Sequence, residues 1–224
     1  MPNFYVVATP IGNMEDITER ALRVLKEVDL ILCEDTRMTK KLLDRYGIQR
    51  PTMSFHSNSK LTKTEKIIEL LREGKDLALV SDAGTPTISD PGAMLISSIK
   101  NDLNIEVNVI PIPGASAVIA ALSASGLPTH EFTFLGFIPH KKGRETLFKE
   151  IAGAKRTMIF YESPHRIMKT LESLVKFCPE KKVCVAREIT KIYEEFKTGT
   201  PEELKNYFNL HPEKQRGEFT VLVS

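Results

Sequence analysis

The fold of this chain is indicated by one stretch, Leu77-Ala-Leu-Val-Ser-Asp-Ala-Gly-Thr-Pro-Thr-Ile-Ser-Asp-Pro-Gly92. Its first part, Leu77–Ser81, is apolar up to a serine, which is typical of a strand buried on both faces of a parallel sheet. The loop Ser81–Gly92 follows and holds two Asp, two Pro, two Gly and four hydroxyl side chains. A connection from strand to helix needs only about 2–6 residues. The stretch therefore predicts an α/β sheet with a ligand-binding loop at the carboxyl end of a strand, and a long surface loop is the alternative.

The same alternation of strand and helix runs through the first half of the chain. Strands are predicted at Phe4–Ala8, Leu30–Cys33, Thr52–Phe55, Leu77–Ser81 and Val107–Ile110. Helices are predicted after an N-cap at Asp16 and over Met38–Tyr46, Thr64–Arg72 and Ala93–Lys100. Apolar strands separated by helices are typical of βαβ units, so we expect a mainly parallel sheet with helices on both faces.

A proline-rich segment, Pro111-Ile-Pro-Gly114, interrupts this alternation. Prolines and a glycine this close together do not suit the interior of a strand or helix, so we place a domain boundary here, between domains 1–112 and 113–224. The second half predicts helices at Ser116–Ala124, Gly143–Ile151, His165–Phe177 and Pro201–Phe208, and strands at Phe132–Phe137, Thr157–Tyr161, Val183–Arg187, Glu194–Lys197 and Phe219–Val223. Some of these strands follow one another without a helix, so we expect a mixed sheet in a second α/β domain.

The composition is that of a soluble globular protein. The chain has 224 residues, of which 42% are hydrophobic and 27% charged, with a formal net charge of +2. That charge neither identifies nor excludes a nucleic-acid binder. Three cysteines without a Cys-x-x-Cys pair argue against a disulfide framework and a zinc site, so no metal is expected. No secretory signal is recognisable, and the apolar stretch 115–127 is too short to span a membrane, so we expect a cytoplasmic protein without membrane contact.

Five polar loops, and a sixth that is a less specific candidate, follow predicted strands, where ligands bind in open α/β sheets. They are Ala8–Asn13, Cys33–Arg37, Ser81–Gly92, Ile112–Ala117, Phe160–Arg166 and Arg187–Lys191. The first contains neither the Gly-x-Gly-x-x-Gly pattern of dinucleotide-binding proteins nor a P-loop. Plain structural interpretations stay open: a tight turn for the first loop, an Asp35–Arg37 ion pair with a helix N-cap for the second, a hinge for the fourth, and a Ser163 N-cap before Pro164 for the fifth.

A basic cluster, His140-Lys-Lys-Gly-Arg144, follows the aromatic segment Phe132–Phe137. Basic side chains beside aromatic ones suit single-stranded RNA, because they combine attraction for phosphate with base stacking. An ordinary solvated surface is the alternative interpretation of the same residues.

Taken together in chain order, these motifs resemble those of the tetrapyrrole methylase superfamily and, within it, the ribosomal RNA small subunit methyltransferase I family. The motifs are Ala8-Thr-Pro-Ile-Gly-Asn13, Asp16-Ile-Thr18, Glu34-Asp-Thr-Arg37, Ser81-Asp-Ala-Gly-Thr-Pro86, Ser89-Asp-Pro-Gly92, Pro113-Gly-Ala-Ser-Ala117, Tyr161-Glu-Ser-Pro-His-Arg166, Arg187-Glu-Ile-Thr-Lys191 and Gly217-Glu-Phe219. The combination is specific, although no single motif is. The resemblance implies two α/β domains with S-adenosylmethionine in the cleft between them, a homodimer, and 2′-O-methylation of a cytidine ribose of 16S rRNA in the decoding region of the small ribosomal subunit.

Carried over motif by motif, the resemblance implies cofactor contacts from several of the loops. The residues are Pro10, Ile11, Asp82, Ala83, Gly84, Thr85, Ile88, Ser116, Ala117, Tyr161 and Ile189. Glu162, which follows Tyr161, and Thr190, which follows Ile189, would also lie at the cofactor. Asp82 would accept hydrogen bonds from ribose hydroxyls or from an amine of the ligand.

Methyl transfer to a sugar hydroxyl calls for a base or a hydrogen-bond acceptor beside that hydroxyl, because a hydroxyl is a poor nucleophile at neutral pH. The candidates are acids at strand ends, Asp35, Glu162 and Glu188, and we favour Asp35 together with Arg37. RNA phosphates are expected to contact basic residues, namely Lys141, Lys142, Arg144, His165, Arg166 and Lys191.

Two features depart from the family pattern. The glycine-rich first loop of the small-molecule tetrapyrrole methylases is replaced by Thr9–Asn13, which favours the RNA-modifying branch. Many members of that branch continue past the Gly-Glu-Phe strand into a helical extension, whereas this sequence ends at Ser224, so RNA contacts made by such an extension would be missing or replaced. A small-molecule methylase acting on a tetrapyrrole and a nucleotide-binding module without catalysis stay open as alternatives.

Overall fold

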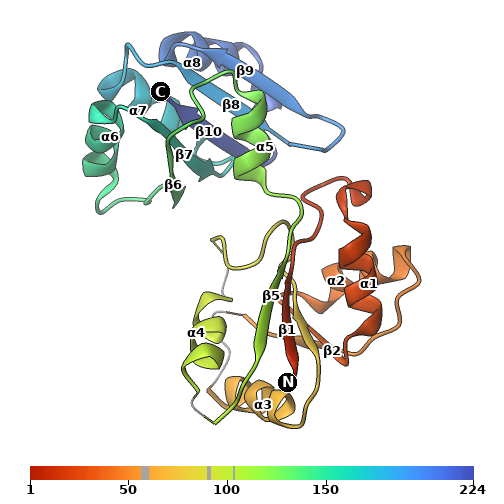
Figure 1. Cartoon of the computed structure of the whole chain (residues 1–224). Coiled ribbons are helices and arrows are strands. Elements are labelled where there is room, and N and C mark those ends of the chain that lie inside the picture. The colour runs from red at the N-terminus through yellow and green to blue at the C-terminus, as the bar shows by residue number, and fades with distance from the viewer. Residues whose placement is uncertain (57–60, 90–91, 103) are drawn as a thin grey trace. The chain divides into compact units, whose positions relative to one another are not determined.

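The computed structural model describes residues 1–56, 61–89, 92–102 and 104–224. By its contacts the chain divides into two units, Met1–Ser116 (unit 1) and Ala117–Ser224 (unit 2), each built around its own sheet (Figure 1). The division falls shortly after the boundary expected at Ile112, because the segment after the last strand of unit 1 stays bound to that unit. The Thr85 hydroxyl, for example, donates a hydrogen bond to the Ala115 carbonyl at 3.1 Å.

Unit 1 contains a parallel sheet, as the alternation of strands and helices predicts. Among the described residues its strands are β1 (Asn3–Val7), β2 (Leu30–Cys33), β3 (Thr52–Ser54), β4 (Leu77–Leu79) and β5 (Asn108–Ile112), in the order β3-β2-β4-β1-β5. Its helices are α1 (Glu19–Glu27), α2 (Thr36–Arg45), α3 (Leu61–Arg72) and α4 (Ala93–Asn101), with a 3-10 helix η1 (Met14–Asp16) before α1.

Helices cover both faces of this sheet because side chains alternate in direction along each strand. On one face, Ile31 of β2 packs with Leu25 of α1. On the other face, the adjoining Leu32 packs with Ile67 of α3 and Leu95 of α4. The expectation of a parallel sheet buried on both sides is therefore confirmed.

Two local predictions for unit 1 are wrong. Helix α1 begins after Thr18, whose hydroxyl accepts the N–H of Ala21 at 3.1 Å, whereas the expected N-cap Asp16 lies in η1. Strand β5 includes Pro111, which we expected outside any strand. Proline is tolerated there because β5 lies at the edge of the sheet, with β1 as its neighbour on one side. On the other side no strand among the described residues accepts hydrogen bonds from the backbone N–H groups of β5, so a residue without an N–H fits there.

Unit 2 contains a mixed sheet, as predicted. In the described part of the chain its strands are β6 (Phe132–Phe137), β7 (Thr157–Glu162), β8 (Val183–Arg187), β9 (Glu195–Gly199) and β10 (Phe219–Val223), in the order β6-β7-β10-β8-β9. Strands β6 and β7 are parallel, and the other neighbours are antiparallel. The helices are α5 (Ala117–Ala124), α6 (Arg144–Gly153), α7 (Ile167–Phe177) and α8 (Pro201–Leu210), with a 3-10 helix η2 (Pro212–Gln215) after α8.

The main core of unit 2 lies between one face of the sheet and helices α6, α7 and α8. Phe160 of β7 and Val221 of β10 pack there with Phe148 of α6, Leu171 of α7 and Phe208 of α8. Helix α5 contacts β10. In the part of the chain that the structure describes, no helix combines the length and the apolar character needed to cross a membrane.

The start of helix α7 differs from the prediction. The helix begins at Ile167 rather than His165, and Pro164 lies in the turn before it. The carbonyl of Ser163 accepts the N–H groups of Arg166 and Ile167 at 3.0 and 3.1 Å, whereas its hydroxyl accepts the Arg166 Nε–H at 3.2 Å. The Ser163 side chain therefore binds a guanidinium and does not cap the helix.

Candidate functional site

In unit 1 the first, third and fourth predicted loops meet at the carboxyl edge of the sheet. Thr9 and Gly84 exchange two backbone hydrogen bonds, at 2.9 and 3.0 Å. The Thr9 hydroxyl donates to the Ser81 carbonyl at 3.2 Å, and the Thr85 hydroxyl donates to the Ala115 carbonyl. The loops after β1, β4 and β5 are therefore joined mainly through backbone groups.

Two glycines allow these loops to approach closely. A Cβ added to Gly84, whose φ is +82°, would lie 3.2 Å from Cγ2 of Ile11. A Cβ added to Gly114 would lie 2.8 Å from the Cβ of Ala8. A larger residue at either position would push the loops apart, so packing between loops explains both glycines.

The second loop joins the same edge through Asp82, whose Oδ1 accepts the backbone N–H of Asp35 at 3.1 Å. Asp35 caps helix α2 by accepting the N–H of Arg37, and its carboxylate pairs with the Arg37 guanidinium at 2.6 Å. The hydrogen bonds from the side chain and the backbone of Arg37 lower the pKa of Asp35 to about 2. Both plain structural roles expected for this loop, the ion pair and the N-cap, are thus confirmed, and Asp35 is a carboxylate at neutral pH.

The residues that the resemblance assigns to the cofactor differ in exposure. Asp82, Ala83 and Ile88 of the third loop are exposed, and 45% of the Ile88 surface is accessible. The others in unit 1 are buried or half-buried: Pro10, Ile11, Gly84, Thr85 and Ser116. Ala117 is half-buried at the start of α5 in unit 2. Asp90 and Pro91 of the third loop lie outside the described residues.

Positive φ angles at residues other than glycine are confined, among the described residues, to two of the predicted loops. Thr87 and Ser89 of the third loop have φ of 77° and 66°, and Glu188 and Thr190 of the sixth loop have φ of 51° and 65°. Such backbone costs about 1–3 kcal/mol at each residue unless its surroundings hold it, and it gathers at functional sites. These angles support the third and sixth loops as parts of a functional site.

In unit 2 the predicted loops also share one edge of the sheet. Strands β7 and β8 are both antiparallel to β10, which lies between them, so β7 and β8 run in the same direction. Phe219, the first residue of β10, pairs with both Glu162 and Arg187, where the fifth and sixth loops leave the sheet. Strand β6 is parallel to β7, so the basic segment after β6 leaves at this edge as well.

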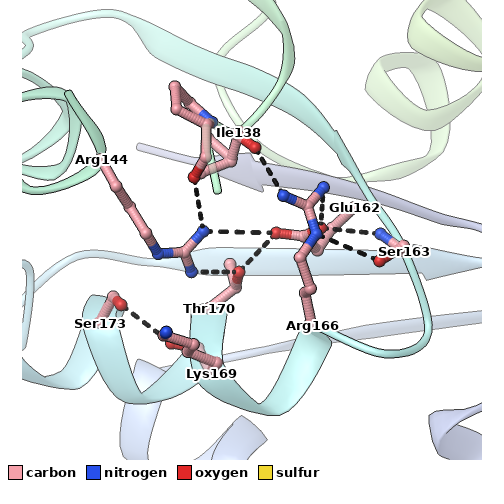
Figure 2. A network of polar contacts seen from close by, with 9 residues as sticks. Ile138, Arg144, Glu162, Ser163, Arg166, Lys169, Thr170 and Ser173 are labelled. Atoms are coloured by element: carbon pink, nitrogen blue, oxygen red, sulfur yellow. Dashed lines mark hydrogen bonds and ion pairs between the residues drawn. The ribbon is translucent and has the colours of Figure 1, made fainter. Parts of the chain in front are cut away.

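A buried network of charges lies at this edge (Figure 2). The Glu162 carboxylate pairs with the Arg166 guanidinium at 2.7 Å and accepts hydrogen bonds from the Thr170 hydroxyl at 2.6 Å and the Ser163 N–H at 2.8 Å. The Arg144 guanidinium donates to the Thr170 hydroxyl at 2.8 Å and lies 3.9 Å from the carboxylate. One fully buried carboxylate thus lies between two arginines.

This network places three of the predicted functional residues inside the protein. Arg144 and Arg166 were expected on an RNA-binding surface, but their side chains are only 9% and 15% exposed. Arg166 donates to the carbonyl of Ile138 at 2.7 Å, and Arg144 donates to that of Pro139 at 3.3 Å. Burial lowers the pKa of Arg144, although the nearby Glu162 carboxylate opposes this shift. The three residues are therefore placed as internal anchors, because the Glu162 carboxylate offsets part of the positive charge of the two arginines away from solvent.

Glu188 and Lys191 belong to a second network at the same edge. The Lys191 ammonium bridges the carboxylates of Glu188 and Glu218, at 3.0 and 2.9 Å. Glu188 also accepts the N–H of Glu218 at 2.8 Å. Burial raises the pKa of Glu188, but the Glu218 N–H and the Lys191 ammonium outweigh it, so the pKa lies below its ordinary value. A Cβ on Gly217 would lie 2.5 Å from the Glu188 side chain, so a glycine is needed there.

The remaining predicted contacts of unit 2 are at or near the surface. Lys141, Lys142 and His165 are exposed, in the segments that follow β6 and β7. Tyr161 is half-buried at the end of β7, and Ile189 is 8% exposed in the sixth loop. The structure thus brings the exposed Lys141, Lys142 and His165 to one edge of the sheet, whereas the side chains of Arg144 and Arg166 are largely buried at the same edge.

Two partners in these networks were missed from the sequence, Thr170 and Glu218. Thr170 lies on the buried face of α7, next to Ile167 and Leu171. A hydroxyl on an apolar helix face, four residues after Arg166, is a signal for a buried polar partner. Glu218 belongs to the Gly-Glu-Phe motif, but its pairing with Lys191 depends on β8 and β10 being neighbours.

Known proteins match this chain over nearly all of its length. Residues 3–205 match the family model described as Tetrapyrrole (Corrin/Porphyrin) Methylases. A Thermotoga maritima protein named ribosomal RNA small subunit methyltransferase I is 43% identical over 224 residues, which cover 100% of this chain and 99% of that protein. Proteins of the same name from Halalkalibacterium halodurans and Bacillus subtilis are 48% and 46% identical, each match covering 98% of this chain and 74% of the relative.

Solved structures share the fold at much lower identity. The methyltransferase CobJ superposes with a TM-score of 0.71 at 20% identity, over 100% of this chain and 94% of that chain. Diphthine synthase superposes with a TM-score of 0.71 at 15% identity, over 99% of this chain and 90% of that chain. Fold, family model and relatives agree with the motif resemblance, and the chain belongs to the ribosomal RNA small subunit methyltransferase I family of the tetrapyrrole methylases.

Proposed function

We propose that this protein uses S-adenosylmethionine to methylate the 2′-hydroxyl of a cytidine ribose of 16S rRNA, in the decoding region of the small ribosomal subunit. The observation that carries the proposal is the 43% identity to the Thermotoga maritima protein over essentially the whole of both chains. That relative is named a small-subunit rRNA methyltransferase. The cytidine, the 2′-oxygen and the decoding region follow from the motif resemblance.

The third loop fits S-adenosylmethionine in its chemistry. Asp82 is exposed, and a carboxylate accepts hydrogen bonds from ribose hydroxyls or an ammonium group. The exposed side chain of Ile88, on the same loop, offers an apolar contact for a flat base. The positive φ angles of Thr87 and Ser89 give the loop an unusual backbone shape, as expected for a built binding loop. We assign the cofactor to this loop and to Pro10 and Ile11 of the first loop.

S-adenosylmethionine supplies, when bound, a methyl group activated by a positively charged sulfur. The chain itself must orient the ribose hydroxyl and share its proton. We assign this role to Asp35, held in place by Arg37 and joined to Asp82 through its backbone N–H. With a pKa of about 2, Asp35 is a weak base, so it accepts a hydrogen bond from the hydroxyl, and the proton released on methyl transfer passes to solvent water.

Transfer of a radiolabelled methyl group tests the proposal. We expect label in the RNA of small ribosomal subunits prepared from cells that lack this modification, at a cytidine whose 3′ phosphodiester then resists alkali. Label in a tetrapyrrole precursor and none in RNA would overturn the proposal in favour of the small-molecule alternative. Cofactor binding without transfer to either acceptor would overturn it in favour of a binding module.

A homodimer and a cytoplasmic location are implied by the resemblance and belong to the same proposal. Sedimentation of the purified chain at micromolar concentration tests the dimer, for which we expect twice the mass of 25.2 kDa. A single species at the monomer mass would remove the dimer from the proposal.

A further inference from the structure

The edge strand β6 contains a β-bulge at its carboxyl end. Phe134 pairs with Ile159 of β7, and the next pair joins Phe137 with Tyr161, so β6 has gained one residue relative to β7. The bulge includes Gly136, whose φ is +67°. Such an extra residue re-aims the side chains that follow it, because the side chains of a strand alternate between two faces.

The bulge decides which side chain after it is buried. Ile138, 1% exposed, packs into the core of unit 2. Phe137 lies on the opposite face, where its ring centroid is 5.4 Å from that of Tyr161. The Tyr161 ring in turn lies 4.9 Å from Phe134, edge to face. Without the bulge, alternation would place Phe137 on the core face.

Phe137 is 57% exposed although the backbone beside it is firmly held. The carbonyls of Ile138 and Pro139 accept hydrogen bonds from Arg166 and Arg144, the two arginines of the buried network (Figure 2). An aromatic ring presented on a fixed backbone loses little conformational entropy when a ligand covers it. These two arginines therefore fix the backbone next to Phe137, so that its exposed ring is held at a defined place.

The same anchored segment carries exposed positive charge. His140, Lys141 and Lys142 follow Pro139 directly and are all exposed, and His165 is exposed after the neighbouring strand β7. An aromatic ring next to lysines is the combination that binds single-stranded nucleic acid, since the ring stacks on a base and the lysines contact phosphates. The charge complements RNA, which makes RNA the occupant that this surface fits.

We propose that Phe137, backed by Tyr161, stacks on a base of the RNA substrate, and that Lys141 and Lys142 hold the adjoining phosphates. The inference rests on the proposed function, since it names a contact for the same substrate. Arg144, Arg166, Glu162 and Thr170 then act as positioning residues that fix the segment from inside the protein.

Binding of two labelled probes by fluorescence anisotropy tests the inference without cofactor or turnover. One probe is an oligocytidine, and the other is an oligonucleotide of the same length with abasic ribose phosphates. We expect Phe137→Ala to weaken oligocytidine binding by about 5- to 100-fold, the loss typical of one stacked base, and to leave abasic binding within about 2-fold. Phe137→Trp should restore binding, whereas Phe137→Leu should not.

Matched controls come from the other end of the same strand pair. Phe132 is 39% exposed at the opposite end of β6, and Phe132→Ala should change neither affinity. The double variant Lys141→Gln with Lys142→Gln should bind both probes more weakly. It should also reduce the salt dependence of binding by about one counterion for each lysine. Lys155→Gln, an exposed lysine just before β7, should change neither affinity. Circular dichroism verifies that each variant is folded.

Two outcomes would overturn the inference. The first is a folded Phe137→Ala variant that binds oligocytidine as the wild type does. The second is a variant that loses self-association in sedimentation while its RNA affinity is unchanged, because the ring would then serve contacts between copies of the chain. If the wild type methylates small subunits in either case, the proposed function stands and this inference alone fails.

Discussion

The two sheet edges that carry the predicted loops are built from different groups. At the edge of unit 1, loops are joined by backbone hydrogen bonds such as those between Thr9 and Gly84, and by close contact at Gly114. At the edge of unit 2, loops are joined by charged side chains around Glu162 and Lys191. A backbone junction is damaged by an added Cβ, whereas a charge network is damaged by a lost charge. The two edges should therefore respond to opposite kinds of substitution.

The largest effect is expected from Glu162→Gln in unit 2. The substitution keeps the shape of the side chain but removes the negative charge that attracts both Arg144 and Arg166. Breaking a buried ion pair by removing one partner costs about 3–5 kcal/mol of unfolding free energy. Urea denaturation followed by circular dichroism measures this loss.

The control is Glu145→Gln, which removes an exposed ion pair with Lys149 in the same unit. We expect it to cost no more than about 0.5 kcal/mol, because exposed pairs contribute little. A loss for Glu162→Gln as small as for Glu145→Gln would show that the buried network does not hold unit 2 together.

The next effect is expected from Gly114→Ala in unit 1. The added methyl group would lie 2.8 Å from the Cβ of Ala8, so the first and fourth loops must separate. Overpacking of this kind costs about 1–3 kcal/mol. We expect a similar loss of unfolding free energy and weaker binding of S-adenosylmethionine, measured by urea denaturation and isothermal titration calorimetry.

Gly153→Ala is the matched control, since a Cβ there meets nothing within 4 Å at the end of helix α6. Alanine is favoured over glycine in a helix, so we expect a neutral change or a gain of up to about 1 kcal/mol. Equal losses for the two variants would contradict the close approach of the loops at Gly114.

Asp35→Asn sharpens the comparison between the two sheet edges. Asp35 is a charged residue at the edge of unit 1, where the loops are joined mainly by backbone hydrogen bonds. Arg37 lowers its pKa to about 2, compared with about 3.9 for an aspartate in an unfolded chain. A lowered pKa stabilises the fold above pH 4, and this stabilisation is lost as the pH falls through about 2. The difference in Tm between wild type and variant should therefore be constant above about pH 5 and shrink toward pH 2.

The same variant tests the assigned role in catalysis. Asparagine still caps helix α2, so we expect the affinity for S-adenosylmethionine to be kept while kcat falls by about 10- to 100-fold. Single-turnover methyl transfer and calorimetry measure the two quantities separately. If only the affinity for the cofactor falls, Asp35 is not the acceptor for the ribose hydroxyl.

The smallest effect is expected from Pro111→Ala in unit 1. Pro111 is exposed and pairs with Val6 from the edge strand β5, so an added N–H has room in solvent. We expect the unfolding free energy to change by no more than about 0.5 kcal/mol. A loss above about 2 kcal/mol would mean that this proline fixes the junction between the loops and the sheet.

Most of the architecture could be predicted from the sequence, because strands and helices leave periodic apolar patterns. The runs Leu30–Cys33, Phe132–Phe137 and Phe219–Val223 form strands with the predicted bounds. The errors fall at element ends, where local chemistry competes. Thr18 caps α1 in place of Asp16, and Pro111 lies in a strand because that strand is at an edge.

The candidate site was predictable in its loops but only partly in the roles of its side chains. The positions of polar loops after strands placed Asp35, Asp82 and Glu188 correctly at the sheet edges. Arg144 belongs to a run that reads as a surface patch, yet its guanidinium is buried with Glu162. No local pattern distinguishes it from Lys142, because burial depends on residues far away in the chain.

The amino-acid sequence alone determined the order of strands and helices, the two α/β halves and the family, because apolar periodicity and loop motifs are local properties. The tertiary structure decided which charges face inward and which rings stay in solvent. The contact of Arg144 with Thr170 and the bulge that turns Phe137 outward both require strands and helices to be assembled first. Such choices depend on which distant side chains exclude water from a group, and that is settled only when the sheet and its helices pack together.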